Sequence, residues 1–105
     1  MKHYAIVIED TAGQELRASF EWGARAWGRP EAQIWFSRMI RQIKTLAALP
    51  ERCSIAPECD EFAETVRHLI VGRYRILFTV RGKQVHVLHV RGAFGGEDAP
   101  DDDDD

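Results

Sequence analysis

The sequence predicts an α+β domain in which an N-terminal strand, an antiparallel helix pair and a three-strand antiparallel meander complete one sheet. Three observations lead to this prediction. A β-branched and aromatic run opens the chain at residues 3–8, two stretches with apolar residues at helical spacing follow, and three extended segments with tight turns between them occupy residues 66–91. A chain of 105 residues, 45% of them hydrophobic, suffices for the core of one domain.

The helix pair is delimited by start and stop signals. Thr11 and Gln14 have the spacing of a capping box, and the first helix is expected to end before Pro30, which suits the first turn of the second. The second helix is expected to run as far as Pro50. So short a link between helices predicts that they are antiparallel. The expected apolar stripes are Leu16, Phe20, Gly23 and Trp27 in the first helix, and Phe36, Met39, Ile40, Ile43 and Ala47 in the second.

The meander is predicted from strands at residues 66–71, 74–80 and 85–91, joined by short turns. The middle strand alternates, so one of its faces should lie under the helices and the other should be partly open, with Arg75 near its middle. The first face comprises Tyr74, Ile76, Phe78 and Val80, and the second comprises Arg73, Arg75, Leu77, Thr79 and Arg81. In the last strand His86 and His89 are expected on opposite faces.

Charge is distributed unevenly along the chain. The net charge is −3, but seven acids lie between Glu97 and Asp105, which leaves +4 for residues 1–96. Residues 66–92 carry six cations and no acid. Two interpretations stay open, an anionic partner or a solvated sheet face balanced by the tail. We therefore expect a single domain over residues 1–94 and a disordered acidic tail over residues 95–105.

Several classes of protein are disfavoured. No apolar stretch approaches the roughly 18 residues of a membrane span, so a cytoplasmic protein is expected. The two cysteines, Cys53 and Cys59, are too few for a disulfide scaffold and lack the spacing of a zinc half-site. They are interpreted as ordinary reduced thiols, and no metal or cofactor is expected.

Three segments, in this order and spacing, resemble the RelE/ParE toxin superfamily. Val66 to Phe78 is similar to that family's second hairpin, and Val85 to Arg91 to its last strand. Leu46 to Pro50, with Ala56-Pro57-Glu58 after it, is similar to its helix end and loop. The resemblance covers roughly residues 3–92. It implies a type II toxin held inactive by a protein antitoxin, which would wrap the toxin with a helix or an added strand.

Members of this superfamily act on different targets. RelE-like members cleave mRNA on the ribosome, whereas ParE-like members poison DNA gyrase and have no known need for a catalytic constellation. Here Ile70 stands where RelE-like members often have a basic residue, and Gly92-Ala93-Phe94 stands where their proton donor would be. The sequence is thus closer to the ParE-like form, although Gly92 departs from the His common there too.

We interpret the chain as a toxin that binds a macromolecular target such as DNA gyrase and is not an enzyme. The alternatives are a ribosome-dependent mRNA endoribonuclease and a non-toxic module that binds only its antitoxin. Its assembly is left open between a homodimer and a toxin–antitoxin hetero-oligomer. The candidates for contact with target or antitoxin are Arg67, Arg73, Arg75, Arg91, Trp22 and Trp35.

Each of these candidates also has a structural interpretation. The guanidinium of Arg75 suits a phosphate or carboxylate, but it can equally pair with an acid of the preceding loop. The four such acids are Glu58, Asp60, Glu61 and Glu64. Trp22 and Trp35 are either exposed anchors or partly buried helix-edge residues. No spacing joins the histidines His68, His86 and His89 into one site.

Overall fold

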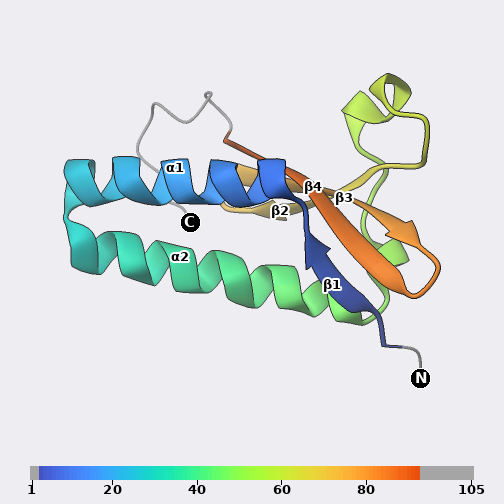
Figure 1. Ribbon diagram of the computed structural model, residues 1–105, viewed down its shortest axis with the longest axis horizontal. Coiled ribbons are helices and arrows are strands. Elements are labelled where there is room, and N and C mark those ends of the chain that lie inside the picture. The colour runs from blue at the N-terminus through green and yellow to red at the C-terminus, as the bar shows by residue number, and fades with distance from the viewer. Residues whose placement is uncertain (1–2, 93–105) are drawn as a thin grey trace.

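The computed structural model describes residues 3–92, which form one sheet packed against a helical hairpin (Figure 1). The elements are β1 (Ala5–Ile8), α1 (Asp10–Trp27), α2 (Arg29–Lys44), β2 (Arg67–Val71), β3 (Tyr74–Arg81) and β4 (Gln84–Gly92). The strand order is β1-β4-β3-β2, with β1 parallel to β4 and the other pairs antiparallel. The predicted fold class is confirmed. The predicted acidic tail lies outside the described residues.

The helix boundaries differ in detail from the prediction. α1 begins at Asp10 without any side-chain hydrogen bond at its cap, so the capping box of Thr11 and Gln14 does not form. The negative charge of Asp10, in the first turn, instead interacts favourably with the positive end of the helix dipole. Gly28 reverses the chain between the helices with a φ of 99°. A residue with a Cβ adopts this backbone conformation only with strain. α2 ends at Lys44, earlier than expected.

Between α2 and β2 the chain forms three short 3₁₀ helices. They are η1 (Thr45–Ala47), η2 (Pro50–Arg52) and η3 (Pro57–Glu61). Each of these helices holds three to five residues, and 3₁₀ helices are usually this short. Leu46 of η1 belongs to the main core, whereas Ala56, just before η3, packs on Leu77 at the sheet face away from the helices. In the described part of the chain, neither helix is long and apolar enough to cross a membrane.

The main core lies between the helices and one face of the sheet, as predicted. Tyr74, Ile76 and Phe78 of β3 are buried there, and Val80 packs beside them. The alternating pattern predicted this because every second side chain of a strand points to the same face. The helices contribute Ala12, Leu16, Trp35, Met39 and Ile43 to the same core.

The second face of β3 is more covered than expected. Leu77 is fully buried in a smaller cluster with Ala56 and Val66, under the segment that carries η3. Thr79 is buried as well, and its hydroxyl donates to the carbonyl of Thr65 at 2.8 Å. The two ends of this face stay accessible, with the Arg75 side chain 29% exposed and that of Arg81 45% exposed.

A β-bulge changes the arrangement of β4. The register between β3 and β4 shifts between Leu77 and Phe78, so that Leu88 is the extra residue. His86 lies opposite Thr79, and His89 lies opposite Leu77. Thr79 and Leu77 share a face, so the two histidines share it as well. The expectation that His86 and His89 point to opposite faces is therefore wrong, because the bulge breaks the alternation between them.

Candidate functional site

Two arginines of the sheet converge on one carboxylate. Arg75 of β3 and Arg91 of β4 lie opposite each other in the register, and Glu58 of η3 reaches down to both. Nη1 of Arg75 donates to Oε1 of Glu58 at 3.0 Å, and its Nη2 donates to Oε2. Nη1 of Arg91 is 3.4 Å from Oε2. The bidentate geometry that suits Arg75 to a phosphate is thus taken by an internal carboxylate.

The charge interactions in this cluster are strong because the Glu58 carboxylate is largely shielded from solvent. The Glu58 side chain is only 14% exposed. The hydrogen bonds from Arg75 are the main cause that lowers the pKa of the Glu58 carboxyl from 4.5 to about 2, and the positive charges of Arg75 and Arg91 add to the effect. The same hydrogen bonds raise the pKa of Arg75. One carboxylate against two guanidiniums leaves the cluster with a net positive charge.

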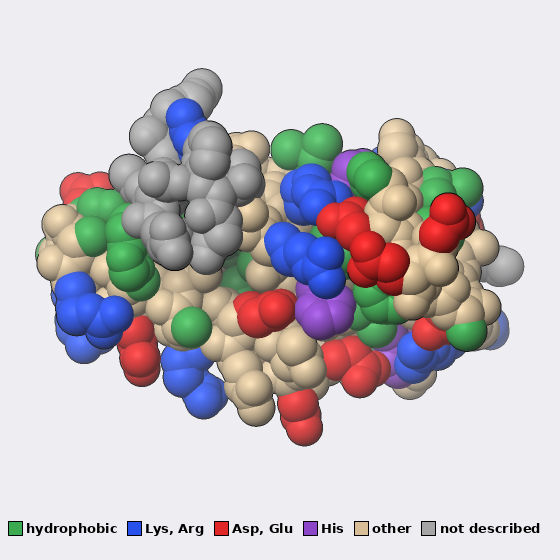
Figure 2. Space-filling model, turned by 90° about the horizontal axis from the view of Figure 1, so that it is seen from above, with side chains coloured by type: hydrophobic (Ala, Val, Ile, Leu, Met, Phe, Trp, Pro, Cys, Tyr) green, Lys and Arg blue, Asp and Glu red, His purple; other side chains and the backbone are tan. Residues whose placement is uncertain are grey.

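His68 of β2 completes the cluster. Its Nδ1 lies 3.0 Å from Nη1 of Arg75. Because a guanidinium only donates hydrogen bonds, Nδ1 must accept, and the ring proton is then on Nε2. Figure 2 shows Lys or Arg, Asp or Glu, and His side chains side by side near the middle of one face of the molecule.

The other two histidines belong to separate groups. Nδ1 of His86 lies 2.6 Å from a carboxylate oxygen of Glu9, and Nδ1 of His89 lies 3.3 Å from one of Glu15. Glu15 also accepts the backbone N–H of Val90 at 2.8 Å. Each histidine thus has its own partner. Within residues 3–92, no three His, Cys, Asp or Glu side chains lie in position to hold a metal ion.

Two of the predicted contact residues meet beside the cluster. Trp22 of α1 and Arg91 of β4 line one groove of about 480 Å³, together with Glu15, Ala18, Ser19, Arg25, Val90 and Gly92. The ring of Trp22 stands edge-on to that of Trp27, with 5.6 Å between centroids. Arg91 connects this groove to Glu58 and so to Arg75.

The remaining candidates are placed differently. Arg67 binds the preceding segment, because its Nη1 donates to the carbonyl of Cys53 at 2.7 Å and to that of Glu51 at 3.3 Å. Arg73 is exposed in the β2–β3 turn. Trp35 is only 9% exposed and packs on Tyr74 with 5.1 Å between ring centroids. Its ring therefore belongs to the core, and the interpretation of Trp35 as an exposed anchor is wrong.

The comparison with known families identifies the chain. Residues 6–93 match the model of the ParE toxin of type II toxin–antitoxin systems, parDE. This chain belongs to the ParE toxin family. Among solved structures it resembles a chain of a chromosomal ParDE toxin–antitoxin system from P. aeruginosa, with a TM-score of 0.73 and 20% sequence identity. That match covers 86% of this chain and 96% of the other. No curated protein matches the sequence.

This ParE-family chain has a second, more apolar groove that its sequence did not predict. It has a volume of about 520 Å³ and lies between α1 and α2, beside the end of β1. The lining residues are Ile8, Gly13, Leu16, Arg17, Phe20, Glu21, Gln33, Phe36 and Ile40. Phe20, Phe36 and Ile40 belong to the predicted apolar stripes but stay half-buried. The apolar stripes of the two helices hold more residues than the sheet can cover, which was the available signal. Ile8, 38% exposed, adds to the apolar surface beside them.

Proposed function

We propose that this ParE-family toxin arrests growth by binding DNA gyrase and does not cleave RNA. The observation that favours binding is the separation of the histidines, each of which has its own partner. Cleavage of RNA through its 2′-hydroxyl needs an acid and a base on either side of one phosphate. Arg75 and Arg91 supply positive charge beside His68, but an arginine stays protonated and makes a poor acid.

The surface offered to gyrase in this proposal is the Glu58 cluster with the adjoining Trp22 groove. Tryptophan and arginine are the residues that most often carry binding energy at protein interfaces. Here Trp22, Arg25 and Arg91 line one groove, and Arg75 adjoins it through Glu58. A partner carboxylate that displaced Glu58 would meet the guanidiniums of Arg75 and Arg91 on adjacent strands.

The experiment compares two readouts of one purified toxin. Gyrase supercoiling should be inhibited, and mRNA on translating ribosomes should stay intact when its ends are mapped by primer extension.

Expression without the antitoxin should arrest bacterial growth, and co-expression should restore it. Cuts at fixed codon positions that disappear in His68→Ala would contradict the proposal and support the interpretation as a ribonuclease. Normal growth with abundant soluble toxin would favour a module that binds only its antitoxin.

Membership in this toxin family implies an antitoxin partner, and we infer that it occupies the groove beside β1. The backbone N–H of Ala5 donates to the carbonyl of Lys83, just before β4, and that of Glu9 donates to the carbonyl of Val87 in β4. By alternation, the N–H groups of Ile6 and Ile8 point away from the sheet. An extended segment can pair with this edge and pack apolar side chains against Phe20 and Phe36, which line the groove. The groove and the edge strand thus form one continuous surface for a single peptide.

A pair of matched variants tests the antitoxin site. Ile8→Arg places a charge in the groove, and Ile70→Arg places the same charge on β2, where Ile70 is 63% exposed. Ile8→Arg should weaken antitoxin binding by at least about tenfold, because a charged group is costly to bury in an apolar contact. Ile70→Arg should bind normally. Equal affinities for the two variants in titration calorimetry would exclude this groove.

A further inference from the structure

The Trp22 groove lies beside Gly92, the last residue of β4, which lines it. We propose that the segment after Gly92 docks back into this groove. Phe94 packs against Trp22, and the acids that follow it lie beside Arg25. The groove belongs to the surface that the proposed function offers to gyrase. The inference rests on that function for its consequence, which is that the toxin partly covers its own binding site.

β4 runs along α1 toward this groove. The backbone N–H of Glu9 donates to the carbonyl of Val87 at 3.0 Å, and the N–H of Val90 donates to the Glu15 carboxylate at 2.8 Å. Between these contacts the chain advances by six residues at the start of α1 (9 to 15) and by three in β4 (87 to 90). Both steps span about 9–10 Å, so the strand and the helix run in the same direction.

A chain that continued in this direction would bring Phe94 to the Trp22 groove. Phe94 is four residues past Val90, which corresponds to about 13 Å of extended chain. About nine residues of α1 span the same distance. Counted from Glu15, they end between Trp22 and Arg25. The place of Phe94 in the sequence thus matches the part of the groove that these two side chains line.

The ring of Trp22 is available for an aromatic partner in the groove. It is half-buried and stands edge-on to Trp27, which covers one of its sides. On the groove side its neighbour on α1 is Ala18, whose small side chain leaves the space of about 480 Å³ open. Aromatic pairs pack favourably in edge-on or offset arrangements. Phe94 is the large apolar side chain of residues 93–105, so it is the residue that fits this place.

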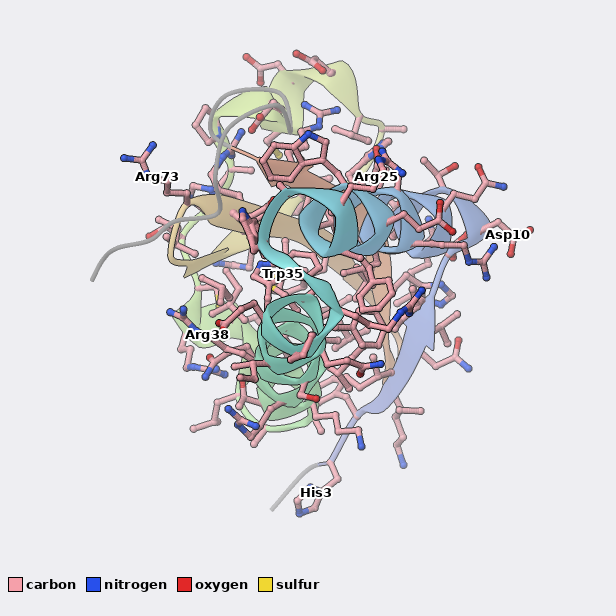
Figure 3. The ribbon with its side chains drawn as sticks, turned by 90° about the vertical axis from the view of Figure 1, so that its left-hand side faces the viewer. His3, Asp10, Arg25, Trp35, Arg38 and Arg73 are labelled. Carbon is pink, nitrogen blue, oxygen red and sulfur yellow. The ribbon has the colours of Figure 1, made fainter. Side chains whose placement is uncertain are left out.

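Arg25 supplies the positive charge that attracts an acidic segment. Its side chain is exposed, and no carboxylate of residues 3–92 forms an ion pair with it. Figure 3 shows Arg25 on the side of α1 that faces away from α2. The acid in the lining, Glu15, accepts a backbone N–H of β4. Glu97 follows Phe94 by three residues, about 10 Å of extended chain, and six further acids come after it.

The covalent tether favours this segment over a separate acidic partner. A ligand joined to its site by a short chain acts at an effective concentration in the millimolar range. Phe94 is only two residues past Gly92, which lines the groove. An acidic run with few apolar residues forms no core of its own, so its attraction to Arg25 needs no fixed geometry. A second copy of the chain carries the same residues but lacks the tether.

The test measures how accessible Trp22 is in the full chain, recovered from its antitoxin complex. The tryptophans are labelled with ¹⁵N, and the Trp22 indole signal is identified by its loss in Trp22→Phe. A neutral soluble nitroxide then broadens each signal according to its exposure. Phe94→Ser should raise the broadening of Trp22 about twofold, as expected when a cover that is in place half of the time is removed. Buried Trp35 is the internal reference, and Pro100→Ser is the matched control that should change neither signal.

Two variants and a salt change test the contribution of charge. Glu97→Gln with Asp98→Asn should raise the broadening of Trp22, and so should Arg25→Gln. The control is Arg41→Gln, which removes an exposed charge outside both grooves and should leave Trp22 unchanged. Salt at about 1 M, where the Debye length is about 3 Å, should act like Arg25→Gln. A Trp22 signal that stays the same in Phe94→Ser and in the Glu97 and Asp98 double variant would overturn the proposal.

Dilution and gyrase inhibition separate the remaining outcomes. Shielding of Trp22 that is lost on dilution would come from the segment of a second copy and would overturn docking within one chain. Phe94→Ser should inhibit gyrase at about half the wild-type concentration, because the apparent affinity falls with the occupied fraction. Equal inhibition by both toxins, with Trp22 uncovered in the variant, would overturn the consequence for gyrase. If Trp22 is uncovered and neither toxin inhibits gyrase, only the proposed function fails.

Discussion

Replacing Glu58 with Gln keeps the shape of the side chain but removes the charge between Arg75 and Arg91. The shift of the Glu58 pKa from 4.5 to about 2 corresponds to at most about 3 kcal/mol, at 1.36 kcal/mol for each pKa unit. The Arg75 and Arg91 side chains are 29% and 36% exposed, so solvent screening reduces this contribution. We expect Glu58→Gln to lower the free energy of unfolding by about 1–2 kcal/mol at neutral pH.

The pH dependence of this loss identifies its cause. The pKa of Glu58 is lower in the folded protein than in the unfolded chain, so its contribution is complete above about pH 4.5 and disappears as the pH falls toward about 2. Urea unfolding of wild type and variant should therefore differ by a constant amount between about pH 7 and 5. The difference should shrink at lower pH, where wild-type Glu58 becomes protonated.

The matched control is Glu61→Gln, a change on the same 3₁₀ helix. Glu61 is exposed and forms no ion pair with a described residue, so its replacement should leave stability nearly unchanged. A Glu58→Gln penalty that stays constant down to about pH 2 would show that shape, and not charge, is responsible. An equal penalty for Glu61→Gln would mean that the loss is a general effect of the segment's charge.

Three further substitutions test the packing. Gly13→Ala should raise the melting temperature by several degrees, because a Cβ there meets no atom within 4 Å and alanine favours a helix over glycine by about 1 kcal/mol. Gly72→Ala should lower it, since φ of 61° in the β2–β3 turn strains any residue with a Cβ. Leu77→Ala should lower the free energy of unfolding by about 2–5 kcal/mol, because Leu77 is fully buried. A Leu77→Ala loss below about 1 kcal/mol would show that the second cluster is loosely packed.

The parts of this fold that were predictable are those encoded by local spacing. The face of β3 under the helices follows from strict alternation of Tyr74, Ile76 and Phe78. The helix–helix link follows from Gly28 and Pro30. The bulge at Leu88 was not predictable, because β4 carries apolar residues on both sides of it and offers no break in pattern. That one residue changed which face His86 and His89 occupy.

The candidate site depended on contacts between distant segments, and local spacing does not determine them. Four acids of the loop were equivalent partners for Arg75 in the sequence. The 3₁₀ turn at η3 directs Glu58 inward and leaves Glu61 in solvent. A charge count finds excess arginine along such a chain, and only the fold shows that Glu58 holds Arg75 and Arg91.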